Sequence, residues 1–298
     1  MKPVGTILAA VDFSESSNFA FKAAVGLVKL FSAELHVIHA FEAPLPLFSS
    51  YGLLVPPAFI SEARDVVARK LEKSCQKATD AGVRAKSHLG AASAADAIVD
   101  LAREVGADLV VMGTRGHTGL KHVLLGSVAE HTVRDGPCAV LTVKGGEMTA
   151  MGTIEKIIVA VDFSEHADQA LEVAVEFAKQ FGAELHLVHA LDVRIPVMTP
   201  YEVVIPTAFI EQARGAVASK LEVLVQKVAT EGVTATSHVS EVPAASAIVD
   251  LAEKLGADLI VMGTRGHTGL KHVLLGSVAE RTLRHAPCSV LTVKTSSG

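Results

Sequence analysis

The chain has 298 residues, of which 50% are hydrophobic and 20% charged, so it can bury more than one core and is not a disordered protein. Its formal net charge of −5 disfavours a general nucleic-acid-binding protein, and no apolar run reaches the roughly 18–20 residues that cross a bilayer. We therefore expect neither a nucleic-acid nor a membrane partner. Three cysteines are too few for a disulfide framework, which favours a reducing, cytoplasmic compartment.

The sequence is a tandem repeat. VDFSE at 11–15 returns at 161–165, and the halves align throughout at this offset without a gap. The segment at 106–130 returns at 256–280 with one change, from Val110 to Ile260. Repeats of this length are the size of a domain, which predicts one domain at 1–145, a second copy of it at 152–298 and a linker at 146–151.

Strand and helix patterns alternate along the first half. The apolar run TILAAVD (6–12) predicts a buried strand, and SSNFAFKAAVGLVKLF (16–31) has its apolar residues at helical spacing. ELHVIHA (34–40) is typical of a second strand. A long helical pattern follows over 57–82 and ends at Gly82.

The later elements complete the pattern. A more polar third strand at 83–90 is typical of a sheet edge, and a helix is predicted at 92–106. ADLVVMG (107–113) is the most apolar strand, and a helix from about Ser127 leads into a last strand, CAVLTVK (138–144). Strand–helix alternation predicts an α/β fold of two tandem doubly wound domains, each a five-stranded parallel sheet with helices on both faces. Ligands of such sheets bind beyond the carboxyl ends of the strands.

A glycine-rich connection, G-x2-G-x9-G-S, follows the strand at 107–113. Gly113 ends the strand, Gly116 lies in the turn, and Gly126 and Ser127 open the next helix. Glycine permits positive φ and a close approach to a ligand, Ser127 suits an N-cap, and a helix N-terminus offers N–H groups to an anion. The spacing predicts a phosphate cradle, and an ordinary strand-to-helix connection would explain it equally well.

The glycine spacing after an apolar strand, together with VDFS at 11–14, resembles the universal stress protein family. The resemblance covers nearly the whole chain, with one family domain in each half. It implies a sheet of order 3-2-1-4-5 and, because both halves keep the glycine motif, two ATP sites per chain. It also implies pairing at the last strand, which the two halves could form within one chain. We further expect a homo-oligomer, a dimer of tandem chains joined through edge strands.

The resemblance implies a set of ligand contacts. The Asp12 carboxylate would contact the nucleoside, the Ala40 backbone would meet the adenine edge, and Val11 would touch the base. The residues expected around the ribose and phosphates are Gly113, Gly116, Gly126, Ser127 and Val128. The matching set in the second half is Val161, Asp162, Ala190, Gly263, Gly266, Gly276, Ser277 and Val278. His117 and His267 stand inside the two loops, where we expect them to reach phosphate.

The positions of the residues disfavour two alternative roles, helix capping by Asp12 and metal binding by His36 and His39. An acid at the end of a strand often caps the next helix, but Ser14 and Ser164 are better placed to do so, which leaves Asp12 for the ligand. His36 and His39 stand three apart on a strand and face opposite sides, so they cannot simply share a metal.

The sequence offers a cradle without a catalytic set. ATP hydrolysis needs a residue that orients water and groups that stabilise the charge of the transferred phosphoryl group. We therefore expect an ATP-binding stress-response module in which nucleotide occupancy regulates assembly or partner docking, with Mg²⁺ arriving on the nucleotide. Two alternatives stay open: a slow ATPase or nucleotidyl-handling enzyme assisted by His117 or His267, and an ATP-independent, chaperone-like structural dimer.

Overall fold

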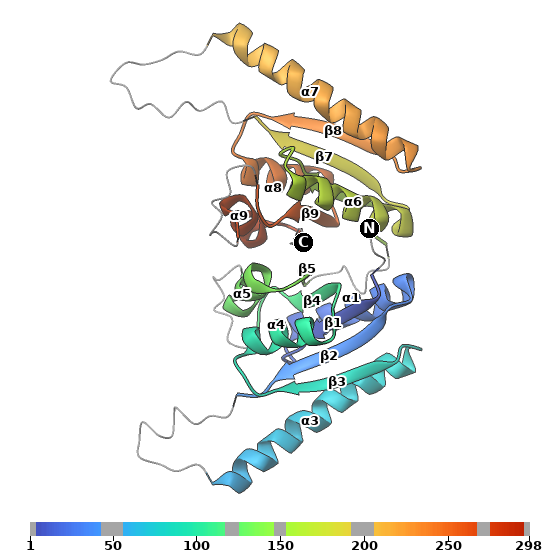
Figure 1. Ribbon diagram of the computed structural model, residues 1–298, viewed down its shortest axis with the longest axis vertical. Helices are drawn as coiled ribbons and strands as arrows, with labels where there is room; N and C mark the ends of the chain where they lie inside the picture. Colours follow the sequence, from blue (N-terminus) through green and yellow to red (C-terminus); the bar gives the residue numbers. More distant parts are fainter. Residues whose placement is uncertain are drawn as a thin grey trace, which may run out of the picture. The chain divides into compact units, whose positions relative to one another are not determined.

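The chain forms two compact units, Lys2–Gly152 and Thr153–Gly298, and both are α/β units (Figure 1). The computed structural model describes residues 4–42, 56–116, 125–145, 153–191, 206–266 and 275–294. The predicted linker at 146–151 lies outside these ranges.

Strands and helices alternate in each unit as predicted. The elements of the first unit are β1 (Thr6–Ala10), α1 (Glu15–Phe31), β2 (Glu34–Ala40), α3 (Pro57–Asp80), β3 (Ala85–Gly90), α4 (Ala94–Glu104), β4 (Leu109–Gly113), α5 (Ser127–Asp135) and β5 (Ala139–Val143). Those of the second unit are β6 (Lys156–Ala160), α6 (Glu165–Phe181), β7 (Glu184–Ala190), α7 (Thr207–Thr230), β8 (Ala235–Ser240), α8 (Ala244–Leu255), β9 (Leu259–Gly263), α9 (Ser277–His285) and β10 (Ser289–Val293).

The sheets have the predicted strand order. Parallel pairing gives the order β3-β2-β1-β4-β5 in the first unit and β8-β7-β6-β9-β10 in the second. The order 3-2-1-4-5 is therefore confirmed in both. The direction of strand addition reverses between β1 and β4, and between β6 and β9, which is where an open α/β sheet binds its ligand.

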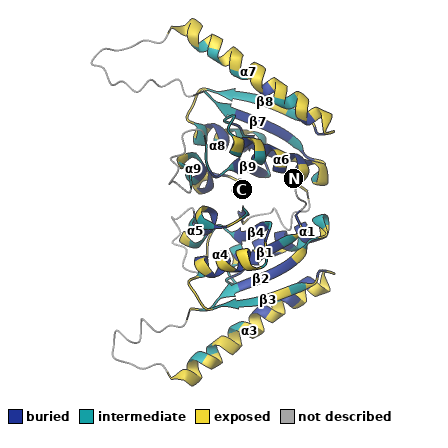
Figure 2. Cartoon of the chain, in the orientation of Figure 1, coloured by how far each residue is buried: buried dark blue, intermediate teal, exposed yellow. Residues whose placement is uncertain are grey.

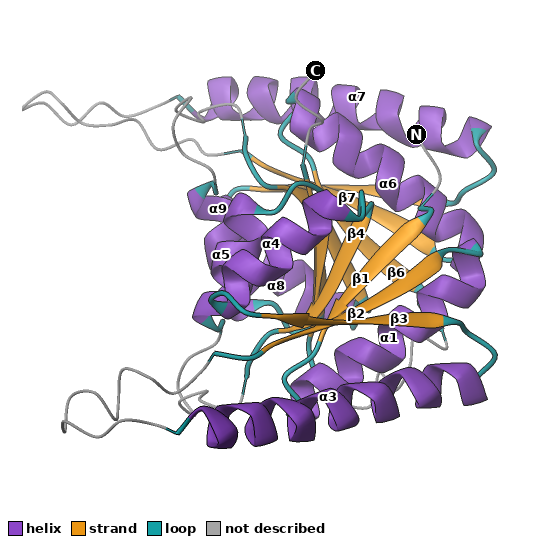
Figure 3. Cartoon of the chain, turned by 60° about the horizontal axis from the view of Figure 1, so that its bottom comes forward, coloured by secondary structure: helices purple, strands orange, loops and turns teal. Residues whose placement is uncertain are grey.

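Helices cover both faces of each sheet. In the first unit α1 packs on β1 and β4, and α3 packs on β2 and β3, while α4 and α5 contact each other and cover the opposite face (Figure 3). The central strands are buried from both sides, which explains their continuous apolar runs, whereas the edge strand β3 is partly exposed and more polar. Ile7, Leu8, Leu35, Leu109 and Leu141 are among the fully buried side chains of this core.

The long helices α3 and α7 are mostly exposed (Figure 2). Leu71, Cys75 and Ala78 are the buried residues of α3, and Leu221 and Val228 are those of α7. Within the described ranges no helix combines the length and the apolarity that a membrane span requires.

Candidate functional site

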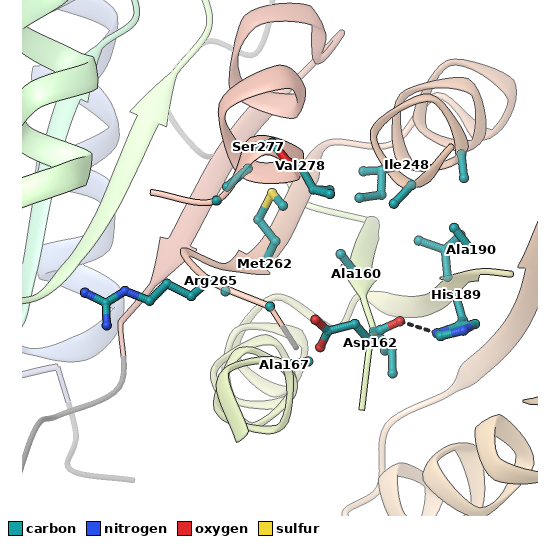
Figure 4. Close-up of a pocket in the computed structure, with 18 of the residues that line it drawn as sticks. Ala160, Asp162, Ala167, His189, Ala190, Ile248, Met262, Arg265, Ser277 and Val278 are labelled. Atoms are coloured by element: carbon teal, nitrogen blue, oxygen red, sulfur yellow. Dashed lines mark hydrogen bonds between the residues drawn. The ribbon is translucent and has the colours of Figure 1, made fainter. Parts of the chain in front are cut away.

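The carboxyl end of β1 is fastened to β2 on the edge of a cavity. The Val11 N–H donates to the Ile38 carbonyl oxygen at 2.9 Å, and the Val11 carbonyl accepts from His39 Nδ1 at 2.8 Å. In the second unit His189 Nδ1 bonds to the Val161 carbonyl at 2.7 Å, which the dashed line in Figure 4 marks. These bonds fix the backbone immediately before the aspartate of each unit.

Asp12 and Ser14 share the turn between β1 and α1. Asp12 Oδ1 accepts from the Ser14 N–H at 2.9 Å, and Ser14 Oγ caps α1 by accepting from the Ser17 N–H at 3.2 Å. Asp162 Oδ1 likewise accepts from the Ser164 N–H at 3.0 Å. The prediction that the serines cap the helices is confirmed, and the second carboxylate oxygen of Asp12 faces the glycine loop.

The glycine loop passes directly over the aspartate. A Cβ on Gly116 would lie 2.6 Å from Asp12 Oδ2, and a Cβ on Gly266 would collide with Asp162 Oδ2. A Cβ on Gly113 would in the same way collide with the first turn of α1, which lies beneath it. None of these glycines has positive φ, so that part of the prediction was wrong. A Cβ at position 113 would also strike backbone, whereas a Cβ at 116 or 266 would push the aspartate carboxylate out of its place beside the loop.

Helix α5 presents an N-terminus without a side-chain cap. Gly126 is the N-cap residue, and Ser127 is the first helical residue, so the prediction that Ser127 serves as N-cap was wrong. The Gly126 N–H donates to the Thr114 carbonyl at 2.8 Å and closes the loop. Gly276 and Ser277 repeat this arrangement at the start of α9. Since glycine supplies no capping side chain, the N–H groups of the first turn form a geometry that favours an anion.

These parts enclose one cavity in each unit. Its volume is about 270 Å³ in the first unit and about 480 Å³ in the second. Predicted residues that line the first cavity are Val11, Asp12, Ala40, Gly113, Gly116, Gly126, Ser127 and Val128. Those that line the second are Val161, Asp162, Ala190, Gly263, Gly266, Gly276, Ser277 and Val278. His117 and His267 lie outside the described residues, and contact with a ligand stays a prediction for the whole set.

Several lining residues escaped the sequence analysis. Ile98 on α4 and Met112 on β4 give the first cavity an apolar wall, as Ile248 and Met262 do in the second. Figure 4 shows Ile248 and Met262 around the space beside Asp162. The helical spacing of α4 reveals which of its residues are apolar, but it does not reveal that Ile98 faces a cavity rather than the closed core.

Histidine and arginine side chains at the cavities have different orientations. His39 and His189 line the cavities at the ends of β2 and β7. Arg265 belongs to the lining of the second cavity, but Figure 4 shows its side chain directed away from Asp162 and Met262. Positive charge at this site therefore comes from the helix N-terminus rather than from the Arg265 guanidinium in this conformation.

His36 is part of a different cluster. Its Nδ1 lies 2.9 Å from Nε2 of His88 on the neighbouring strand, and its Nε2 lies 3.5 Å from a carboxylate oxygen of Glu34. Across the part of the chain that the structure describes, no three His, Cys, Asp or Glu side chains are arranged to hold a metal ion.

The sequence model of the universal stress protein family matches residues 3–144 and, a second time, residues 153–294. The chain belongs to the universal stress protein family. Each match covers one structural unit with its cavity, so the protein is a tandem member with two family domains.

Relatives of known sequence match about half of the chain. A universal stress protein of Methanocaldococcus jannaschii is 40% identical over 144 residues, which are 47% of this chain and 82% of that protein. The universal stress protein YxiE of Bacillus subtilis is 38% identical over 144 residues, 46% of this chain and 97% of that protein. The crystal structure of a universal stress protein from Archaeoglobus fulgidus matches 97% of this chain and 96% of its own, with a TM-score of 0.73 and 25% identity.

Proposed function

We propose that each unit binds one ATP molecule in its cavity, so that the chain is a stress-response module with two nucleotide sites. The observation that carries this proposal is the contact between glycine loop and aspartate, where a Cβ on Gly116 would lie 2.6 Å from Asp12 Oδ2. An uncapped helix N-terminus stands on the same cavity and can receive phosphates. Membership of the universal stress protein family, with the glycine motif intact in both halves, supports the same assignment.

The two ends of a nucleotide suit different walls of the first cavity. The apolar wall of Ile98 and Met112 accommodates the base, with the backbone of Ala40 at the adenine edge and Val11 beside it. Asp12 accepts hydrogen bonds from the nucleoside, because a carboxylate beside a ribose can accept from its hydroxyl groups. The second unit offers the corresponding walls from its own residues.

The phosphates belong at the other end of the cavity. The glycine backbone at 113, 116 and 126 and the N–H groups of Ser127 and Val128 surround them. Mg²⁺ binds chiefly to the phosphate oxygens in such a site, since hard cations keep oxygen ligands and several waters.

Occupancy of these sites then regulates assembly or docking. In each unit the glycine loop and the last strand are neighbours, because the Thr114 N–H donates to the Val143 carbonyl at 3.3 Å and Thr264 N–H to the Val293 carbonyl at 3.1 Å. The last strand ends the sheet of its own unit, so a change in the loop reaches the strand through which chains would pair. We place this function in the cytoplasm, where the nucleotide is abundant and thiols remain reduced.

Calorimetric titration of Mg-ATP into nucleotide-free protein tests the proposal. We expect two sites per chain, one of which is lost in Gly116→Ala and the other in Gly266→Ala, each with a fall in affinity on the order of tenfold or more. The matched control is Gly215→Ala on α7, where a Cβ meets nothing within 4 Å. Heat equal to buffer dilution in the wild-type chain would contradict the proposal and favour an ATP-independent structural role.

A further inference from the structure

A three-layer stack of side chains stands behind the aspartate of the first unit. The Phe13 ring lies against the His39 ring with centroids 4.6 Å apart and planes 24° apart. Lys70 of α3 places its Nζ over the Phe13 ring, 5.7 Å from the centroid. An ammonium group at this distance is attracted by the negative face of the ring. The stack therefore joins an exposed helix to the strand end that borders the cavity.

The second unit contains the corresponding three side chains in a more tilted arrangement, with the two ring planes 36° apart. Phe163 lies against His189 with centroids 4.8 Å apart, and Lys220 of α7 places its Nζ 5.3 Å from the Phe163 centroid. The lysine is present in both units although the two helices differ elsewhere. For instance, Arg69 of α3 corresponds to Ser219 of α7. The two helices thus differ in their exposed surfaces, but each places a lysine ammonium group over the equivalent phenylalanine ring.

The stack holds an unfavourable backbone conformation. Phe13 has φ of 65° and Phe163 has φ of 61°, in the left-handed region that a side chain with a Cβ rarely adopts. This turn brings the Ser14 N–H to Asp12 Oδ1 at 2.9 Å and directs Oδ2 toward Gly116. The position of the carboxylate in the cavity therefore depends on a turn that phenylalanine does not favour by itself.

The histidine fastens the stack to the strand end. A backbone carbonyl can only accept, so His39 Nδ1 carries the proton that it donates to the Val11 carbonyl at 2.8 Å. His189 does the same toward Val161 at 2.7 Å. The ring that supports the phenylalanine is thus fixed on the residue immediately before the aspartate.

We propose that Lys70 and Lys220 are positioning residues of the two sites: each ammonium group holds the Phe–His stack, and with it the left-handed turn that presents Asp12 or Asp162 to the ligand. The inference rests on the proposed nucleotide binding, and it adds that α3 and α7 are coupled to occupancy of the cavities. Ligand binding is therefore expected to order the lysine-bearing turns of these helices.

Titration of Mg-ATP into the full chain tests this role through lysine variants. Lys70→Met keeps the length of the side chain without its charge, and we expect it to weaken the first site about two- to fivefold, as an exposed cation–π contact predicts. Lys70→Arg, which keeps the cation, is expected to restore the wild-type affinity. The second site of the same chain is the internal control, and Lys73→Met, three residues from Lys70, is the matched control on α3. Equal affinities of Lys70→Met and wild type would overturn the proposal.

Variants of Phe13 separate the turn from the stack. Glycine adopts the left-handed region without cost from a Cβ, whereas alanine does not. If the stack serves to hold the turn, Phe13→Ala weakens the first site more than Phe13→Gly does. An equal loss in both would show that the turn is not what the stack supports. Absence of ATP binding by the wild-type chain would instead remove the proposed function itself, so the two failures are distinguishable.

Discussion

His36 and His88 face each other through ring nitrogens 2.9 Å apart, with ring centroids 5.0 Å apart. The two facing nitrogens share one proton, so the bond is lost once both rings are protonated. Burial, followed by the charge on His88, lowers the pKa of His36 below its ordinary value of 6.5, although Glu34 opposes this. Burial also lowers the pKa of His88, opposed by Glu104 on α4 and assisted by Lys86 on β3.

Acidification is therefore expected to destabilise the first unit. A histidine whose folded pKa is lowered resists the proton that the unfolded chain accepts, so the stability is complete above pH 6.5 and is lost as the pH falls toward the lowered pKa. Hydrogen exchange of the β2 and β3 amides at about pH 7.5 and about pH 5.5, corrected for intrinsic rates, measures the loss.

A double variant supplies the control for this prediction. His36→Gln with His88→Gln removes both titrating groups, and the pH dependence of β2 and β3 should become shallower while that of β7 and β8 is unchanged. An unchanged slope in the variant would mean that other groups govern acid sensitivity. In the second unit, burial lowers the pKa of His238, and the charges of His186 and Lys254 lower it further.

Ser32 and Gly182 occupy equivalent places after α1 and α6, and both have positive φ, 54° and 70°. Left-handed φ strains serine but not glycine. We expect Ser32→Gly to stabilise the first unit by about 0.5–1 kcal/mol and Gly182→Ser to destabilise the second by a similar amount. Differential scanning calorimetry measures both, and changes of the same sign would contradict the explanation.

Asp108 fastens the start of β1 to the start of β4. Its Oδ2 accepts from the Gly5 N–H at 2.9 Å and the Thr6 N–H at 3.0 Å. Because Asp108→Ala removes two hydrogen bonds to a charged acceptor, the unfolding free energy should fall by about 2 kcal/mol in urea denaturation. Asp258→Ala provides a matched measurement, since Asp258 Oδ2 holds two N–H groups in the second unit at 2.8 and 3.0 Å. A loss confined to one unit would show that the contact is not equivalent in the two repeats.

Local sequence patterns predicted the elements well and the contacts between them poorly. The central strands were predictable because burial on both faces leaves a continuous apolar run, as at 109–113. The end of α3 was predictable because a glycine often follows a helix, and Gly82 has the positive φ, 82°, that this position favours. The pairing of His36 with His88 spans 52 positions and depends on strand register, which no local pattern contains. The left-handed Phe13 was equally hidden, because phenylalanine is not the residue that such a turn favours.

The glycine loop shows the same contrast between what local sequence predicts and what contacts between elements decide. Spacing placed Gly113, Gly116 and Gly126 on one cavity and suggested both positive φ and a close approach to a ligand, whereas the structure shows close approach to groups of the protein itself and no positive φ. The reason is that a glycine in sequence records only the absence of a side chain. Whether that absence serves the backbone angle or a neighbouring group is decided by what packs against the glycine, here Asp12 from the turn after β1.

Ser127 separates binding from folding. Gly126, not Ser127, is the N-cap of α5, so Ser127→Ala should change the unfolding free energy by less than about 0.5 kcal/mol. If the Ser127 hydroxyl donates to a phosphate, the same variant should weaken the first ATP site about five- to tenfold, the loss of a hydrogen bond worth about 1–1.5 kcal/mol. Titration calorimetry and thermal denaturation of one preparation measure both quantities.

Ser14→Ala is the converse variant. Ser14 caps α1 through its bond to the Ser17 N–H, so its loss should lower the unfolding free energy by about 1 kcal/mol. The backbone N–H of residue 14 still bonds to Asp12 Oδ1 in this variant, so ATP affinity at the first site should change little. If Ser127→Ala instead lowered the melting temperature and left the ATP affinity at the wild-type value, the Ser127 hydroxyl would act in the helix rather than on the ligand.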